Sequence, residues 1–198
     1  MTPARRTATA PEAARKAPPG RNRVRIIGGV WRSRLVRFSP SAELRPTPDR
    51  VRETLFNWLG QHLDGLEALD LFAGSGALGF EALSRGAARV VMVERDRRVA
   101  EGLLEAAREL DAKAAHVVQG EALEFLARDT AAYDVVFLDP PYASDLAARA
   151  LAALPARMKP CGRVYVETAA PLAAAAPWRV VREARAGAVR YALFEIDR

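Results

Sequence analysis

The sequence is poor in the residues that build disulfides and metal centres. Its 198 residues include one cysteine, Cys161, and two histidines, His62 and His116, whose separation does not match the spacing of metal ligands. A disulfide framework and a multi-cysteine metal site within the chain are therefore excluded, and we expect no bound metal. Each histidine is expected to lie at the surface or half-buried.

Long apolar runs are also missing. No run approaches the roughly 18 residues that a membrane span needs, and residues 1–20 lack the apolar core of a signal peptide. We therefore expect a cytoplasmic protein in a reducing compartment. A mitochondrial transit peptide would also be basic and poor in acids, but the serine-free Ala/Pro/Arg composition of residues 1–20 favours a disordered bacterial tail.

Acidic residues are nearly absent from the start of the sequence. Residues 1–37 hold ten Arg or Lys against the single acid Glu12, a net charge of +9, so the other 161 residues sum to −3. This asymmetry indicates a polyanionic partner, because each neutralised phosphate releases counterions. A solvated basic tail is the alternative for residues 1–22. It explains residues 24–38 less well, because their charges alternate with apolar residues.

The length and the 50% hydrophobic composition predict one domain, from about residue 23 to residue 198, after a disordered basic tail at 1–22. Two short β-prone runs, 24–27 and 35–38, predict a small hairpin at the start of this domain. Phosphate pairing and base stacking would let this segment contact RNA. The residues predicted to do so are Arg25, Trp31, Arg32 and Arg34.

A helix is predicted to begin near Thr47 and Pro48, with Thr47 as its cap and Pro48 in its first turn. Apolar residues follow at helical spacing and predict a buried stripe. The stripe consists of Val51, Leu55, Trp58 and Leu59, with Trp58 assigned to the core. Arg50 and Arg52 fall off this stripe, so we expect them to face solvent or a ligand.

From residue 66 onward, β-like runs alternate with helical stretches, which predicts an α/β fold with a parallel sheet. Strands are predicted near 68–72, 89–94, 116–119, 133–138 and 162–167, and helices near 78–85, 97–110, 121–128 and 145–154. The last two β-like runs, 179–183 and 189–196, are too close for a helical crossover, so they are predicted to pair as an antiparallel closing hairpin. Residues 169–177 are predicted to form a loop.

A glycine-rich loop follows the first of these strands. Gly74, Gly76 and Gly79 have the G-x-G-x-x-G spacing, which lets a tight turn bring the backbone close to a ligand at the start of a helix. Glu94 ends the next strand, where an acid would receive two ribose hydroxyls. The alternative for Glu94 is a surface ion pair with one of the arginines that follow it.

Two nucleotide cofactors share this geometry. NAD would need a pyrophosphate at the glycine loop and a hydride-handling pair, and no catalytic His or Lys lies in a suitable loop. S-adenosylmethionine instead carries an amino-acid moiety, for which Asp70 at the end of the first strand is a candidate ammonium partner. Glu121, just past the third strand, is placed to approach the adenine amine. The sequence therefore favours S-adenosylmethionine.

The run Leu-Asp-Pro-Pro-Tyr at 138–142 ends the apolar strand 133–138. Asp139 and Tyr142 are therefore expected at the carboxyl end of a buried strand, where α/β sheets bind ligands. The loop combines a carboxylate, the carbonyl of Pro140, whose conformation Pro141 restricts, and an aromatic face. This set fits a planar base with an exocyclic amine that stacks on Tyr142. An acidic turn closed by prolines is the alternative.

Longer runs carry a resemblance to a known family. They are RIIGGVWR at 25–32, LRPTPDRVRETLFNWL at 44–59 and the stretch 69–85, which includes the glycine loop. Together with the Asp-Pro-Pro-Tyr loop, they make the chain from about residue 23 to residue 198 resemble the RsmD family. Members of that family are bacterial 16S ribosomal RNA guanine-N2 methyltransferases that use S-adenosylmethionine.

The resemblance implies a Rossmann-like class I methyltransferase with a seven-stranded, mostly parallel sheet. It also implies a monomer that acts on a guanine of the small ribosomal subunit or its assembly intermediate. The residue after the third strand, often Asp or Asn in such proteins, is Glu121 here. The residues expected to contact the cofactor are Asp70, Phe72, Gly74, Gly76, Gly79, Glu94, Arg95, Glu121 and Ala122. The expected catalytic residues are Asp139, Pro140 and Tyr142, and the expected substrate contacts are Arg25, Trp31, Arg32, Arg34, Arg45, Arg50 and Pro141.

The expected reaction is direct transfer of the methyl group from the sulfonium to guanine N2, whose delocalised lone pair is a poor nucleophile. Asp139 and the Pro140 carbonyl would accept the two N–H bonds and hold the nitrogen in line. A DNA adenine-N6 methyltransferase would use the same loop, but it would usually need a larger recognition domain. A catalytically idle RNA-binding assembly factor is the third hypothesis, which an intact Asp139 and glycine loop disfavour.

Overall fold

The computed structural model describes residues 22–38, 46–141, 144–169 and 175–197. The predicted tail at 1–22 therefore lies outside the described residues except for Asn22, and so does most of the predicted loop at 169–177. The two candidate site residues Arg45 and Tyr142 also lie outside them.

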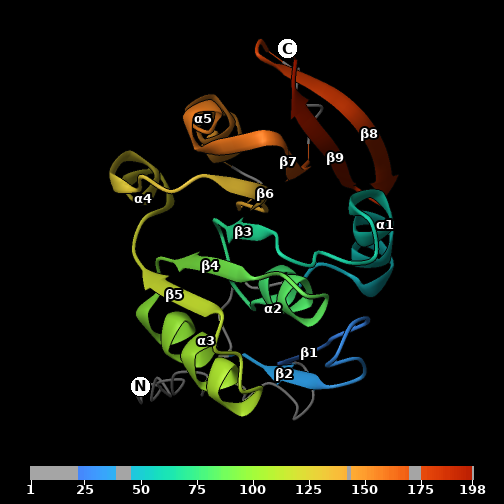
Figure 1. The fold of residues 1–198 in the computed structure, drawn as a ribbon, viewed down its shortest axis with the longest axis vertical. Coiled ribbons are helices and arrows are strands. Elements are labelled where there is room, and N and C mark those ends of the chain that lie inside the picture. The colour runs from blue at the N-terminus through green and yellow to red at the C-terminus, as the bar shows by residue number, and fades with distance from the viewer. Residues whose placement is uncertain (1–21, 39–45, 142–143, 170–174, 198) are drawn as a thin grey trace, which may run out of the picture.

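A seven-stranded sheet forms the centre of the molecule (Figure 1), in the order β5-β4-β3-β6-β7-β9-β8. Strands β3 to β7 run parallel, and β9 and β8 run antiparallel at one edge, which confirms the predicted parallel sheet with a closing hairpin. The strands are β3 (Glu67–Asp70), β4 (Arg89–Glu94), β5 (Ala115–Gln119), β6 (Tyr133–Leu138), β7 (Met158–Thr168), β8 (Trp178–Ala186) and β9 (Val189–Ile196).

Helices cover both faces of this sheet, so the central strands are apolar on both sides. One face packs against α1 (Asp49–Leu59), α2 (Ala77–Ser84) and α3 (Arg97–Glu109). The other packs against α4 (Ala122–Arg128) and α5 (Leu146–Ala153), with the short 3₁₀ helix η1 (Pro155–Arg157) before β7. Figure 1 shows the sheet between these two layers.

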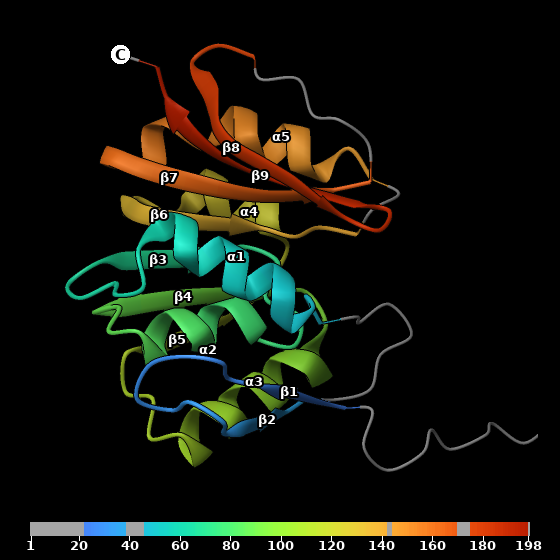
Figure 2. The same cartoon turned by 90° about the vertical axis from the view of Figure 1, so that its right-hand side faces the viewer.

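The predicted hairpin at the start of the domain is present. Strands β1 (Arg23–Arg25) and β2 (Leu35–Arg37) pair antiparallel, and their central residues Val24 and Val36 lie opposite each other and are buried. The tip of the hairpin is anchored at the end of α2, where Val30 N donates to Ser84 O at 2.7 Å. Figure 2 shows the hairpin lying along α2 and α3.

Two predictions for the start of α1 are wrong. Pro48, which has no side-chain donor or acceptor, occupies the cap position, so Thr47 does not cap the helix. Arg52 does not face solvent or ligand but is 0% exposed, with its Nη1 3.2 Å from Glu81 Oε2. The predicted stripe is correct at Val51 and Leu55, which are buried, whereas Trp58 and Leu59 are half-buried and pack against the core.

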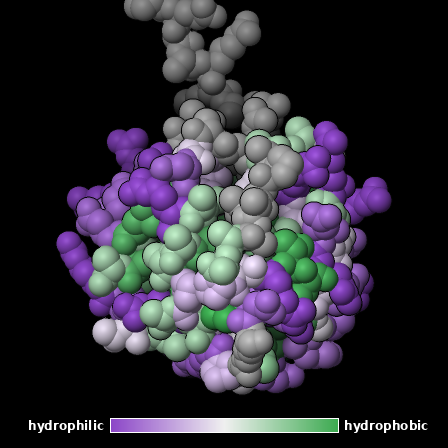
Figure 3. Space-filling view, turned by 90° about the horizontal axis from the view of Figure 1, so that it is seen from above, coloured by the Kyte–Doolittle hydropathy of each residue, from purple (hydrophilic) through white to green (hydrophobic). Residues whose placement is uncertain are grey.

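The edge strand β8 is protected from pairing with other chains by charged side chains. Hydrophilic side chains surround the apolar ones on the face seen in Figure 3. His62, His116 and Cys161 are all exposed. In the part of the chain that the structure describes, no group of three or more His, Cys, Asp or Glu side chains is arranged to hold a metal ion, and no helix is long and apolar enough to cross a membrane.

Candidate active site

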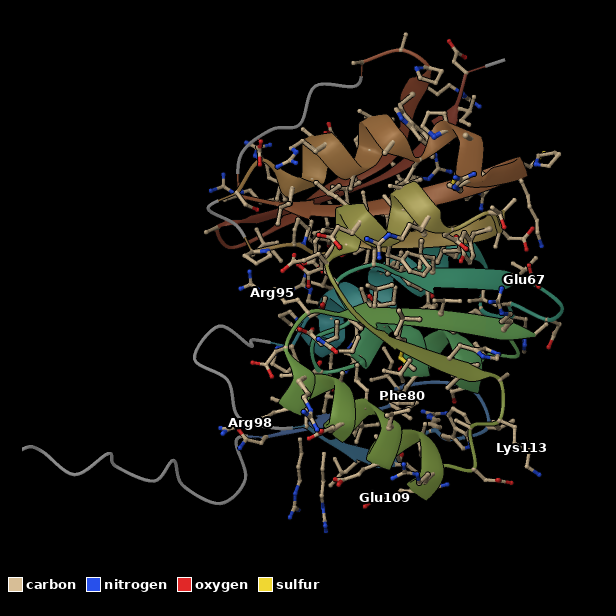
Figure 4. The ribbon with its side chains drawn as sticks, turned by 90° about the vertical axis from the view of Figure 1, so that its left-hand side faces the viewer. Glu67, Phe80, Arg95, Arg98, Glu109 and Lys113 are labelled. Atoms are coloured by element: carbon tan, nitrogen blue, oxygen red, sulfur yellow. The ribbon has the colours of Figure 1, made fainter. Side chains whose placement is uncertain are left out.

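A pocket of about 550 Å³ opens at the carboxyl ends of β3, β4 and β6. This is the edge of an α/β sheet at which ligands bind. In Figure 4, Arg95, which follows β4, lies at this edge, and Glu67, the first residue of β3, lies at the opposite edge. The candidate residues that line the pocket are Asp70, Phe72, Gly74, Glu94, Arg95, Glu121, Ala122, Asp139, Pro140 and Pro141.

The glycine loop has the backbone geometry that its sequence predicts. Gly74 and Gly76 have φ values of +49° and +74°, in the left-handed region that favours glycine, and α2 starts directly after Gly76. Gly79 lies against the sheet, where an added Cβ would come within 2.7 Å of Met92 Sδ. Gly76 and Gly79 therefore shape the loop and the helix behind it, whereas Gly74 lines the pocket itself.

Glu94 is held in one orientation by the backbone around it. Its Oε2 accepts from Gly74 N at 2.9 Å, and its Oε1 accepts from Asp96 N at 2.8 Å. Each carboxylate oxygen keeps a second lone-pair direction for another donor. A half-buried carboxylate fixed in this way is suited to receiving two hydroxyls of a ligand.

Asp70 is buried at the end of β3, where its Oδ2 accepts from Gly79 N at 3.0 Å. Burial raises the pKa of the Asp70 carboxyl to about 7, an effect that the Gly79 N–H partly offsets and the charge of Glu94 increases. A cationic group brought into the pocket would stabilise the ionised form of Asp70. The site is therefore electrostatically suited to an ammonium group.

Asp139 follows the last residue of β6, and every residue of that strand except Asp134 is buried. Its Oδ2 accepts a hydrogen bond from Thr47 Oγ1 at 3.1 Å, so the segment before α1 closes over this carboxyl. Pro140 is buried and Pro141 is exposed. The loop continues with Ser144, whose hydroxyl donates to the Pro141 carbonyl at 2.7 Å.

The pKa of the Asp139 carboxyl lies well above its ordinary value. Burial is the main cause, the charges of Glu167 and Asp70 act in the same direction, and the hydrogen bond from Thr47 acts against them. A carboxyl with raised proton affinity is suited to accepting a proton near neutral pH. Strongly shifted groups in a pocket mark candidate functional residues.

The candidate substrate residues are not brought together. Arg25 forms an ion pair with Asp49 at 3.0 Å at the start of α1, near which Arg50 is exposed. Trp31 and Arg34 lie farther along the hairpin, toward its tip. Trp31 N donates to Ser84 Oγ, and Arg34 Nη2 donates to Glu109 O, so both contact the ends of helices that lead away from the pocket.

Arg32 lies next to Trp31 at the tip of the hairpin. Helix α2 begins at Ala77, which lines the pocket, and has eight residues, so the hairpin tip at its end lies about 12 Å along the helix axis from the pocket edge. Trp31 is also half-buried and packed against the core, which leaves less of its ring for base stacking. The sequence predicts that these side chains contact RNA, and nothing in the described residues tests that prediction.

Two functional candidates were missed by the sequence predictions. Thr47 has the pattern of a helix cap, and its partner Asp139 is 92 residues away, so nothing local identified its position. Glu167 lies at the carboxyl end of β7, beside β6. The rule that pointed to Asp139, an acid after an apolar strand, would have pointed to Glu167 as well.

Comparison with known proteins agrees with this geometry. Residues 24–195 match the family model described as Conserved hypothetical protein 95. The chain is 42% identical over 188 residues to Ribosomal RNA small subunit methyltransferase D of Haemophilus influenzae, covering 91% of this chain and 97% of that protein. It is 41% identical over 181 residues to the protein of the same name in Escherichia coli K12, covering 89% and 91%.

A solved structure, titled putative methyltransferase yhhF from Escherichia coli, superposes with a TM-score of 0.79 at 42% identity and covers 88% of this chain and 98% of that one. These matches cover nearly the whole length of this chain and of each relative, so they include the sheet, the glycine loop and the pocket described above. The chain belongs to the RsmD family of ribosomal RNA small subunit methyltransferases.

Proposed function

We propose that this protein transfers a methyl group from S-adenosylmethionine to the exocyclic N2 amine of a guanine in 16S ribosomal RNA, in the small subunit or its assembly intermediate. The observation that carries the proposal is the position of Asp139. It directly follows β6 and lines the same pocket as Gly74 of the glycine loop and Glu94. The names of the relatives support the RNA substrate, and the proposal places the protein in the cytoplasm as a monomer.

The residues of the pocket fit S-adenosylmethionine. Glu94 would offer lone pairs to two ribose hydroxyls, Asp70 would bind the ammonium group, and Glu121 and Ala122 would hold the adenine. When bound, the cofactor supplies an electrophilic methyl group on a sulfonium that leaves as a neutral thioether. The acidic side chains of the pocket favour a cationic ligand, and the apolar lining lowers the effective dielectric around it.

Asp139 and Pro140 act on the substrate amine. The lone pair of guanine N2 is delocalised into the ring, so the site must hold the nitrogen in a reactive orientation. The Asp139 carboxylate and the Pro140 carbonyl accept its two N–H bonds, and Asp139 then takes the proton that the nitrogen loses. Tyr142, which lies outside the described residues, is proposed to stack on the base.

The direct test is methyl transfer from labelled cofactor to small subunits that lack the modification, followed by mapping of the modified nucleotide. Label on a guanine N2 supports the proposal. Label on adenine N6 of duplex DNA, offered in a parallel reaction, would instead favour a DNA enzyme that uses the same loop. Binding to subunits without any transfer would indicate an RNA-binding assembly factor.

Replacing Glu94 should weaken cofactor binding. Loss of two charge-assisted hydrogen bonds in Glu94→Ala is expected to cost about 1.5 to 3 kcal/mol, or roughly 10- to 150-fold in Kd. Isothermal titration calorimetry with S-adenosylmethionine measures this effect. The matched control is Glu101→Ala, which removes an exposed acid of α3 that forms an ion pair with the exposed Arg97. Equal affinities for both variants would contradict the role of Glu94.

The RNA is proposed to approach over the pocket end of the hairpin and not over its tip. Arg23 and Arg37 lie directly opposite each other, both exposed, at the end away from Ser84. Like charges opposite each other destabilise a strand pair, so an anionic partner accounts for this arrangement. Figure 4 shows Arg98 at this end and Lys113 at the other.

A pair of double variants tests this orientation. Arg23→Gln with Arg37→Gln should reduce the slope of log affinity against log salt by about one unit for each lost phosphate contact. Arg32→Gln with Lys113→Gln removes the same charge at the far end and should leave the slope unchanged. Filter binding to the small subunit at several salt concentrations gives both slopes. The reverse result would place the RNA over the tip.

A further inference from the structure

Two acidic side chains lie at the carboxyl ends of the neighbouring strands β6 and β7, beside the pocket. In the parallel pair of β6 and β7, Leu138 lies opposite Val166. Asp139 is the residue after Leu138, and Glu167 is the residue after Val166. Because neighbouring positions of paired strands share a face, both side chains fall on the same face of the sheet. Asp139 lines the pocket, whereas Glu167, only 1% exposed, is not among the described lining residues.

Glu167 is held in place by aromatic residues. Its Oε1 accepts from Tyr165 Oη at 2.9 Å, and Tyr191 lies opposite it on β9, with its ring 6.2 Å from that of Tyr165. A buried carboxyl is costly to keep ionised. The mechanism proposed above does not use Glu167, so its position beside Asp139 requires an explanation.

We infer that Glu167 is a positioning residue that acts through Asp139, setting the protonation state in which Asp139 meets the substrate amine. The inference rests on the proposed function. As N2 bonds to the methyl carbon, one of its N–H bonds breaks and that proton passes to the Asp139 carboxylate. A negative charge at Glu167 strengthens Asp139 as the acceptor of this proton.

The electrostatics of the cluster agree with this arrangement. The groups that face Asp139 are Glu167 from β7, Asp70 from β3 and Thr47 from the segment before α1. After burial, the charge of Glu167 is the largest cause of the raised Asp139 pKa. Burial and then Glu167 likewise raise the pKa of the Tyr165 hydroxyl, which keeps it a hydrogen-bond donor.

The sign of the expected effect follows from these charges. Glu167→Gln removes the neighbouring negative charge, so ionisation of Asp139 becomes easier and its midpoint moves to lower pH by about one unit. Carboxyl ¹³C NMR of the free protein measures this midpoint directly, with the Asp139 signal assigned by its absence in Asp139→Asn. The acid limb of the single-turnover rate should move in the same direction, and the plateau rate should fall because Asp139 is a weaker base.

Tyr165→Phe gives a second, milder perturbation. It removes the hydrogen bond that stabilises the Glu167 charge, so the Asp139 midpoint should again move to lower pH, by a smaller amount. Glu183→Gln removes an exposed acid of β8 and should leave the midpoint unchanged. If Glu167→Gln does not fold, the shift of the Asp139 midpoint in Tyr165→Phe alone tests the inference.

The outcomes separate this inference from the proposed function. A rate that falls equally at every pH, with the Asp139 midpoint unmoved in the variant that folds, would make Glu167 structural and overturn the inference. Transfer by the unsubstituted protein to a different base or atom would overturn the proposed function instead. The NMR midpoint is measured without substrate, so it tests the link between the two carboxyls in either case.

Discussion

Asp139→Ala is expected to lower the single-turnover rate of methyl transfer by on the order of 10²-fold or more, while the affinity for S-adenosylmethionine stays nearly unchanged. The substitution removes the group proposed to orient the amine and to take its proton, effects realised mainly in the transition state. Glu94 and the glycine loop, proposed to hold the cofactor, remain. Rapid-quench assays with saturating labelled cofactor measure the rate, and calorimetry measures the affinity.

The control for this variant is Asp145→Ala. Asp145 belongs to the same connection between β6 and α5, its side chain is 73% exposed, and its carboxylate lies 3.6 Å from Arg149. This variant removes the same charge from the same segment but should retain nearly full rate. Transfer by Asp139→Ala within a few-fold of normal would leave the loop a structural turn, and the carboxylate role would be abandoned.

The sequence predicted the sheet and much of the pocket because those signals are local. The run 133–138 is apolar, and Asp139 and two prolines follow it, so both its burial and its end are encoded within the nine residues 133–141. The glycine spacing similarly encodes a turn whose φ values at Gly74 and Gly76 are positive. Since parallel strands align their carboxyl ends, acids placed after separate strands converge at one edge without further information.

The errors concern contacts between distant segments. Arg52 lies off the apolar stripe of α1, and charged side chains are rarely buried unless they are paired. Its partner Glu81 lies 29 residues away in a different helix, so the helical pattern gave no sign of the pairing. The charge asymmetry of residues 1–37 predicted a polyanionic partner, but it could not show which end of the hairpin lies beside the pocket.

Glu81 connects three elements through one buried carboxylate, and its removal should have the largest effect on stability. Its Oε2 accepts from Ile27 N at 2.8 Å and lies 3.2 Å from Arg52 Nη1, and its Oε1 lies 2.9 Å from Arg85 Nε. Glu81 is 0% exposed, as is Arg52. The carboxylate therefore joins the hairpin, α1 and α2 where solvent does not compete.

Glu81→Ala should lower the free energy of unfolding by about 3 to 5 kcal/mol, because it leaves two buried guanidinium groups without their shared counter-ion. Denaturant unfolding followed by circular dichroism measures this change. The control Glu101→Ala breaks the exposed pair with Arg97 in α3, and it should cost only about 0.5 kcal/mol or less. Similar costs for the two variants would show that the Arg52–Glu81–Arg85 cluster does not hold the hairpin to the domain. A large cost at Glu81 that persists in high salt would support the cluster, because buried pairs are weakly screened.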